Sequence, residues 1–296
     1  MTPVIAESQP PSAPISFPWT TIGWVSVLLA ICYGPLLLGL ANQWNYDPDM
    51  GHGFFVPVIA AYIAWQKRAE VAATASAPNW WGLVVVLWGG LQLYIATLGA
   101  EIFLQRTSFV ISVIGVVLLL GGVPYLRIFA FPLFLLFFMV PIPAIIYNEV
   151  TFPLQLIASS AAENAIGWLG IPVIREGNVL VLADTSLNVV EACSGIRSLL
   201  TLTFLSLVYG YFLEKRTWLR TVLFFSTIPI AVVANAGRVT MTGVIASFKP
   251  EWAEGLIHEA QGWVIFMVGL AILIAFHQVV VAFLGRRGKN ASEVAA

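Results

Sequence analysis

Long apolar runs dominate the pattern of hydrophobic and polar positions along the chain. Seven of these runs are long enough to cross a bilayer, since about 20 helical residues span its hydrocarbon core. They lie at 20–41, 80–99, 107–122, 128–147, 194–213, 220–246 and 260–284. A shorter run at 53–66 is an eighth candidate. The pattern predicts an all-α, polytopic membrane protein with about eight transmembrane helices.

Basic residues between the runs predict how the helices are oriented. Nine Lys and Arg residues fall on one side of the predicted membrane: Lys67, Arg68, Arg127, Lys215, Arg216, Arg220, Arg286, Arg287 and Lys289. Three fall on the other side: Arg106, Arg175 and Lys249. The positive-inside rule then predicts that both termini are cytoplasmic. The weak run at 53–66 is retained because, without it, Lys67 and Arg68 would share a side with Arg106.

One long connection, residues 148–192, is expected on the outer, periplasmic face. Its first part, NEVTFPLQLIASSAAENAIGWLG, has the apolar spacing of an amphipathic helix lying in the membrane interface. Its second part, IPVIREGNVLVLADTSLNVVEAC, predicts a short β-hairpin, with two strands around a turn at 183–185. The loop is therefore expected to hold an interfacial helix and a hairpin.

The two ends of the chain differ from the apolar region between them. Residues 1–19 contain five prolines and no Lys or Arg, so they lack the basic start of a signal peptide. We interpret 1–19 as a disordered cytoplasmic tail, 20–285 as the transmembrane domain, and 286–296 as a basic cytoplasmic tail.

Composition supports a membrane protein and narrows its chemistry. Of the 296 residues, 59% are hydrophobic and 10% are charged, whereas a soluble domain carries roughly 25% charged residues. Fourteen basic and fifteen acidic residues leave no basic surface for nucleic acid. The two cysteines, Cys32 and Cys193, form neither a disulfide framework nor a metal-binding pattern, and no cofactor or metal is expected. Cys32, within an apolar run, is interpreted as a small apolar residue.

Three polar residues on different predicted spans fall at one depth in the membrane. Cys193 precedes Glu214, at the cytoplasmic end, by about twenty residues, or about 30 Å of helix. Arg238 lies eighteen residues beyond Arg220, or roughly 27 Å. His258 comes immediately before the last span. We therefore expect a thiol, a guanidinium and an imidazole near the outer boundary.

These three groups together suit acyl transfer. The positive end of a helix dipole and a nearby cation both favour the thiolate of Cys193, which is the form that attacks a carbonyl carbon. His258 would take up and return the proton. Arg238 would stabilise the thiolate or the oxyanion of a tetrahedral intermediate. The predicted reaction cleaves a peptide bond through a thioester.

Each of the three residues also has a plainer interpretation. Cys193 would be a small apolar residue, Arg238 the partner of a buried carboxylate, and His258 an interfacial cap. An arginine within a span is costly, however, which favours a functional role for Arg238.

Four neighbours are candidates for supporting roles. Arg197 lies one turn after Cys193 on the same helix face, and Glu191 lies two residues before it. These two residues either tune the thiol or pair with one another. Glu259 adjoins His258, and Ser194 adjoins the thiol as the other possible nucleophile.

Several motifs resemble the exosortase and archaeosortase family of membrane transpeptidases. They are EACSGIRSL at 191–199, NAGRV at 235–239, a histidine ahead of the final span, GHGFFVP at 51–57 and REGNVLVL before the cysteine. The resemblance extends from about residue 20 to 285. It assigns the family's cysteine, arginine and histidine to Cys193, Arg238 and His258. His52, in the GHGFFVP motif, is either a substrate contact or a structural residue.

The resemblance also implies a substrate and a location. Exosortases process exported proteins that carry a C-terminal Pro-Glu-Pro motif, a transmembrane helix and a basic tail, the PEP-CTERM signal, in bacteria that make exopolysaccharide. It implies a multi-pass protein of the bacterial inner membrane whose site faces the periplasm. If water resolves the thioester, the enzyme is a protease; if another nucleophile does, it is a transferase.

Other classes of protein fit the sequence less well. A zinc protease needs HExxH, but HEAQG at 258–262 places Gly262 at the second histidine. A rhomboid-like serine protease needs a GxSG serine, and here Ser194 follows Cys193. A transporter or scaffold for exopolysaccharide export is the alternative from another class. Transporters place ionisable residues near the midplane of repeated halves, and this chain shows neither feature.

Overall fold

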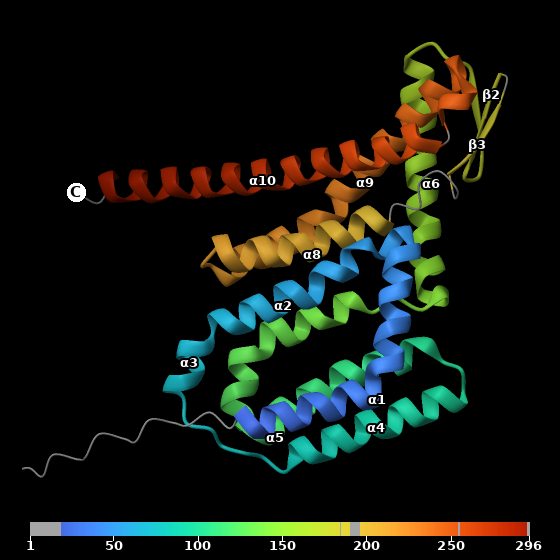
Figure 1. The fold of residues 1–296 in the computed structure, drawn as a ribbon. Coiled ribbons are helices and arrows are strands. Elements are labelled where there is room, and N and C mark those ends of the chain that lie inside the picture. Colours follow the sequence, from blue (N-terminus) through green and yellow to red (C-terminus); the bar gives the residue numbers. More distant parts are fainter. Residues whose placement is uncertain (1–18, 184, 190–195, 254, 295–296) are drawn as a thin grey trace, which may run out of the picture. The chain divides into compact units, whose positions relative to one another are not determined.

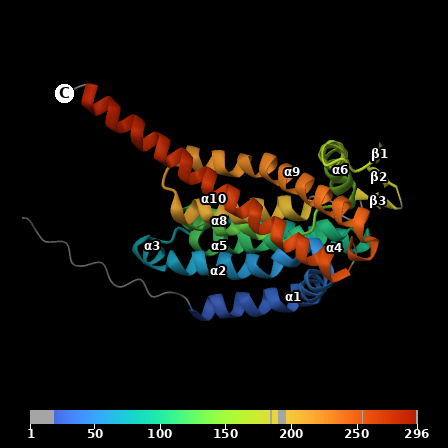
Figure 2. The same ribbon diagram turned by 90° about the horizontal axis from the view of Figure 1, so that it is seen from above.

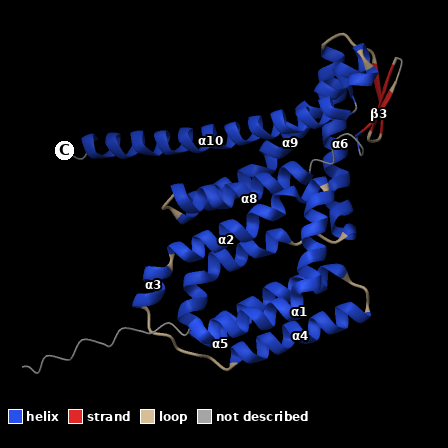
Figure 3. Cartoon of the chain, in the orientation of Figure 1, coloured by secondary structure: helices blue, strands red, loops and turns tan. Residues whose placement is uncertain are grey.

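The structure is a computed structural model that describes residues 19–183, 185–189, 196–253 and 255–294. Most of these residues are helical, and the strands form one small sheet (Figure 3). The chain divides into two compact units. The first contains residues up to Asp47 together with Gly51–Val140, and the second contains Pro48–Met50 together with Pro141–Ala296. The predicted tail at 1–19 lies almost entirely outside the described residues.

The first unit is a set of helices joined by short loops (Figure 1). It comprises α1 (Trp19–Tyr46), the end of the 3-10 helix η1 (Pro48–Phe54), α2 (Phe55–Gln66), α3 (Arg68–Ala73), α4 (Trp81–Leu98), α5 (Ile102–Leu135) and η2 (Leu136–Met139). Small residues bring α4 and α5 close together. A Cβ on Gly115 would lie only 2.7 Å from the backbone nitrogen of Val86. Such small residues let helices pack tightly in a bilayer, where apolar burial does not drive their association.

Helix α5 consists of two helical stretches that meet in a sharp kink at Gly122. Gly122 has φ 71° and ψ −166°, a backbone conformation that is essentially limited to glycine. The preceding residue, Gly121, accepts a backbone hydrogen bond from Ala77 at 3.2 Å. The runs predicted at 107–122 and 128–147 therefore correspond to the two helical stretches on either side of Gly122, which follow one another without a loop as far as Met139.

The predicted number of eight spans is not confirmed. Among the described residues, six helices are long and apolar enough to cross a membrane. The predicted runs at 107–122 and 128–147 form one of these six. The run at 53–66 forms α2, which has only 12 residues. The protein is thus a multi-pass, mostly helical membrane protein.

The second unit combines long helices with the sheet (Figures 1 and 2). It comprises α6 (Ala144–Trp168), β1 (Val173–Glu176), β2 (Val179–Leu182), β3 (Ser186–Asn188), α8 (Ile196–Leu213), α9 (Thr217–Phe248), the 3-10 helix η3 (Pro250–Ala253) and α10 (Gly255–Val294). Helix α9 packs against α6, α8 and α10. Helix α10 continues through most of the predicted basic tail at 286–296.

The sheet has three antiparallel strands in the order β1-β2-β3, one more than predicted. The two strands predicted on either side of 183–185 are β2 and β3, which pair antiparallel, and the amide of Leu182 donates to the carbonyl of Thr185 at 2.8 Å. The additional strand, β1, pairs with β2 through a two-residue turn at Gly177 and Asn178. Gly177 has φ 66°, as the first central residue of a tight hairpin turn of this kind requires.

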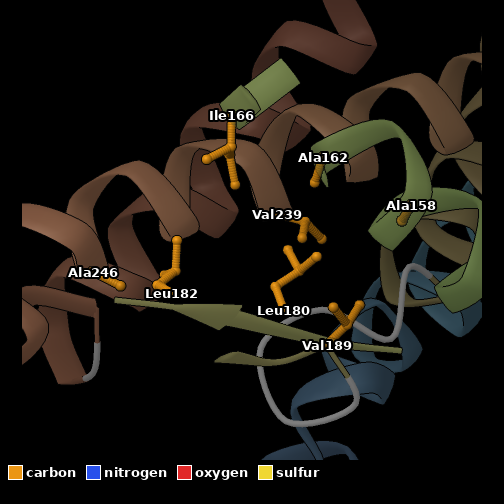
Figure 4. Packing of buried hydrophobic residues seen from close by; sticks show 8 residues of the cluster. All are labelled: Ala158, Ala162, Ile166, Leu180, Leu182, Val189, Val239 and Ala246. Atoms are coloured by element: carbon orange, nitrogen blue, oxygen red, sulfur yellow. The ribbon is translucent and has the colours of Figure 1, made fainter. Parts of the chain in front are cut away.

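The sheet is held to the helices by a small hydrophobic core (Figure 4). Side chains of β2 and the segment after β3 point towards α6 and α9. The cluster consists of Ala158, Ala162, Ile166, Leu180, Leu182, Val189, Val239 and Ala246. The predicted interfacial helix is α6, which begins at Ala144 and is not one of the six candidate spans.

Candidate functional site

Arg238 is a buried cation within a membrane-spanning helix. It lies in α9, in the candidate span Thr217–Phe248, and its residue is only 7% exposed. Asn235 lies one turn before it and Thr242 one turn after it, and both are buried. Residues three and four apart share a helix face, so these three form a polar stripe on the buried side of α9.

Helix α10 faces this stripe with a glycine, Gly262. A Cβ on Gly262 would lie 3.4 Å from Nη2 of Arg238 and 3.5 Å from its Cζ. The preceding residue, Gln261, accepts a hydrogen bond at Oε1 from the hydroxyl of Thr242 at 2.9 Å. Gly262 therefore provides the space that the guanidinium occupies, while Gln261 fixes α10 to α9 one turn away.

Two buried amide groups near Arg238 lack acceptors. Neither Nδ2 of Asn235 nor Nε2 of Gln261 has a hydrogen-bond partner among the described residues. Asn235 also lines a cavity, together with Leu154, Leu199, Ile228, Ala231 and Val232. Sequence reasoning included Asn235 in the NAGRV motif but gave it no role. The available signal was an amide side chain inside an apolar run.

The remaining principal candidates fall where the structure gives less detail. Cys193, Glu191 and Ser194 lie in 190–195, outside the described residues. His258 and Glu259 lie on the first turns of α10, and their side chains are also outside the description. The convergence of Cys193, Arg238 and His258 remains a prediction.

The described backbone around these positions belongs to the second unit. Val189, just before the 190–195 segment, packs in the same hydrophobic cluster as Val239, the residue after Arg238. Position 258 lies one turn before Gly262 on α10, on the same helix face. Both predicted partners of Arg238 are therefore attached to elements that pack against α9.

Arg197 pairs with an acidic residue that sequence reasoning did not select. Its Nε donates to Oδ1 of Asp49 at 2.9 Å, and the hydroxyl of Tyr147 donates to Oδ2 of the same carboxylate at 2.6 Å. The Arg197 side chain is 44% exposed. The predicted alternative partner was Glu191. Asp49 lies two residues before the GHGFFVP motif, which was the only signal in the sequence.

His52 lies in the first unit and is buried. The next residue, Gly53, packs against the indole of Trp44, and a Cβ there would lie 2.7 Å from Cγ of that ring. The indole nitrogen of Trp44 donates to the carbonyl of Met139 at 3.0 Å. The second glycine of this motif, Gly53, is thus needed for close packing against Trp44.

A second polar cluster joins α8 to α10. Nδ1 of His277 lies 2.8 Å from the hydroxyl of Tyr209, and Nε2 lies 3.2 Å from Oε2 of Glu214. The backbone N–H of Arg216 donates to Oε1 of Glu214 at 2.8 Å. This bond, helped by His277 and opposed by burial, holds the pKa of Glu214 below its ordinary value. Sequence reasoning did not select His277, although it is a lone histidine in an apolar run.

The described residues offer no obvious metal centre: no group of three or more His, Cys, Asp or Glu residues is placed to hold an ion. Six candidate spans and a buried guanidinium between α9 and α10 define a multi-pass membrane protein with a polar site inside its helices. A profile of the transmembrane exosortase family matches residues 44–275, well over half of the chain. The chain therefore belongs to the transmembrane exosortase family. Comparisons with curated proteins and with solved structures find no match.

Proposed function

We propose that this exosortase-family protein is a membrane cysteine transpeptidase or protease. Its substrates would be exported proteins with a C-terminal Pro-Glu-Pro motif, a transmembrane helix and a basic tail. The observation that carries the proposal is Arg238, a guanidinium buried in a membrane span and facing α10 one turn from position 258. A permanent charge in a span is costly, so such a residue indicates function.

The register of α8 and α9 supports a role for Cys193. The hydroxyls of Thr203 and Thr227 lie 3.2 Å apart. Leu199, four residues before Thr203, and Ala231, four residues after Thr227, line the same cavity. The two helices are therefore antiparallel. A residue a given number of positions before Thr203 on α8 lies at the same height as the residue equally far after Thr227 on α9. By this spacing the described start of α8, Ile196, lies level with the turn of α9 that precedes Arg238.

Chain connectivity then limits where the thiol can be. Cys193 precedes Ile196 by three residues, so their Cα atoms are at most about 11 Å apart. Arg238 lies about 6 Å along α9 from Ala234, one helical turn. These distances are compatible with a thiol and a guanidinium that share one substrate carbonyl.

The proposed reaction has two steps. The Cys193 thiolate attacks the carbonyl carbon of the scissile peptide; a C–S bond forms and the carbonyl electron pair moves to oxygen. Arg238 stabilises this oxyanion. When the carbonyl re-forms, the C–N bond breaks and the amine leaves with a proton from His258, which had received it from the thiol. Water or another nucleophile then gives its proton to His258, attacks the thioester and releases the thiolate.

The location follows from the distribution of basic residues. We propose an inner-membrane protein with cytoplasmic ends, including residues 1–19 and 286–296, and a site that faces the periplasm. A substrate helix whose basic tail is held in the cytoplasm would present its motif at the outer boundary. That is the depth proposed for Cys193, Arg238 and His258.

Trapping the thioester tests the proposal. Full-length protein is mixed with a tagged, membrane-anchored substrate, and a hydroxylamine-sensitive adduct is sought. We expect the adduct and the cleaved product with the wild type and with Cys32→Ser, and neither with Cys193→Ala at equal abundance. Ser194→Ala distinguishes the two candidate nucleophiles. Processing that survives Cys193→Ala overturns the assignment of the nucleophile, whereas a wild type that gives neither adduct nor product overturns the proposed function and favours a transport or scaffold role.

A further inference from the structure

The side-chain amide of Asn235 is the feature of the second unit that the proposed mechanism leaves unexplained. Asn235 is 3% exposed, and its Nδ2 has no hydrogen-bond acceptor among the described residues. A buried donor without an acceptor is destabilising, and buried polar groups in folded proteins are nearly always paired. An acceptor supplied by a bound substrate would account for this donor.

The cavity beside Asn235 indicates the kind of acceptor. Its other lining side chains are all apolar and come from three helices, α6, α8 and α9: Leu154, Leu199, Ile228, Ala231 and Val232. The cavity therefore combines an apolar wall with a single amide donor. The cavity is about 10 Å³, which is room for one acceptor atom. A main-chain carbonyl oxygen that enters from an adjoining apolar segment matches that combination, because the oxygen accepts a hydrogen bond and the apolar wall needs no polar partner.

The position of Asn235 links this donor to the proposed reaction. Asn235 lies one turn before Arg238 on the buried face of α9. The α8 residue that lines the cavity with it, Leu199, is six residues after Cys193 in the chain. Asn235 thus faces the helix that follows the proposed nucleophile, whereas Arg238 contacts Gly262 on α10.

We infer that Asn235 donates a hydrogen bond to the carbonyl oxygen of the scissile peptide and to the oxyanion formed from it. This inference rests on the proposed function and adds a catalytic residue to it. The amide supplies a fixed dipole and Arg238 supplies the full charge, so two groups from adjacent turns of α9 stabilise one developing negative charge. Such donors act mainly in the transition state, and removal of one costs about 10²–10³-fold in kcat.

The test compares two variants with a matched control. Asn235→Asp keeps the shape but removes the NH₂ donor, and Asn235→Leu replaces the amide by an apolar group of similar size. Thr227→Val is the control, because Thr227 is also fully buried on α9, two turns away, and its hydroxyl bonds with Thr203 on α8 and Phe224 on α9 among the described residues. We expect kcat to fall about 10²-fold in both Asn235 variants, with KM nearly unchanged and Thr227→Val close to the wild type.

A second readout separates oxyanion stabilisation from a structural role. A substrate-derived peptide aldehyde adds the Cys193 thiol to its carbonyl carbon and places negative charge on the oxygen, whereas the matching peptide alcohol cannot. We expect Asn235→Leu to weaken aldehyde inhibition about 10²-fold and to leave inhibition by the alcohol unchanged. Both are measured with equal amounts of monodisperse protein.

The outcomes distinguish this inference from the proposal beneath it. If Cys193→Ala abolishes processing but Asn235→Asp and Asn235→Leu keep wild-type kcat, the role of Asn235 is wrong and the proposed function stands. Equal weakening of aldehyde and alcohol inhibition also overturns the inference. If the wild type gives neither adduct nor product, both the function and the inference are wrong.

Discussion

Replacement of Gly262 by leucine should displace the Arg238 guanidinium and slow processing. A Cβ at position 262 would lie 3.4 Å from Nη2, an ordinary contact, so alanine is tolerated. Each further bond adds about 1.5 Å, and the branched leucine side chain requires the guanidinium to retreat by more than 1 Å. A misplacement of about 1 Å can cost about 10²-fold in rate, so we expect kcat to fall by at least that factor in Gly262→Leu. Gly262→Ala should remain close to the wild type.

Gly237→Ala is the matched control for this series. Gly237 adjoins Arg238 on the same helix, but a Cβ there would meet nothing within 4 Å. Processing of a tagged substrate is followed on gels, and thermal unfolding in detergent is recorded for each variant, since overpacking costs about 1–3 kcal/mol. A wild-type kcat in Gly262→Leu, or equal impairment of Gly237→Ala, would refute the role given to Gly262.

Three further predictions concern stability. Gly122→Ala should destabilise the protein by about 1–3 kcal/mol because of its positive φ, whereas Gly90→Ala, with open space on a helix, should be neutral or stabilising in denaturant melts; equal effects would contradict this. A double-mutant cycle of Asp49→Asn and Arg197→Gln should give a coupling of about 0.2–1 kcal/mol, since the pair is partly exposed, and strict additivity would refute the pair. Because the pKa of Glu214 is lowered in the folded protein, its carboxylate stabilises the fold at pH values above its ordinary pKa of 4.5, and this stabilisation is lost as the pH falls through the folded pKa. The melting temperatures of the wild type and Glu214→Gln should therefore differ at pH 7 and converge in acid. A difference that stays constant with pH would contradict this prediction.

Hydropathy was sufficient to predict the helical class and several boundaries. The run at 194–213 became α8, Ile196–Leu213, and the run at 220–246 became α9, Thr217–Phe248. The bilayer imposes a length and a composition on each span, so these features are visible in a single sequence. The kink at Gly122 is different, because glycine is common in loops as well as in kinks, and the sequence alone does not show that Gly122 adopts φ 71° and ψ −166°.

Only some residues of the candidate site could be selected from the sequence. Arg238 could be selected because a charge inside an apolar run is costly wherever it points. The partners Asp49, Asn235 and Gln261 could not, because a polar residue acquires a role only through the side chains that packing brings to it. The Arg197–Asp49 pair joins residues 148 positions apart, a separation that no periodicity encodes.

Gly262 matters both in the sequence motif and in the packing of α10 against α9. In HEAQG it stands where a zinc protease has its second histidine, and in the structure it is the residue that leaves space for Arg238. An imidazole there would occupy the volume that the guanidinium fills. A guanidinium also keeps its charge in a low-dielectric interior, where an imidazolium or an ammonium can lose its proton. Gly262 therefore removes the second histidine of a zinc motif and leaves space for the guanidinium of Arg238. In the proposed reaction, the permanent positive charge of Arg238 is what the oxyanion would require.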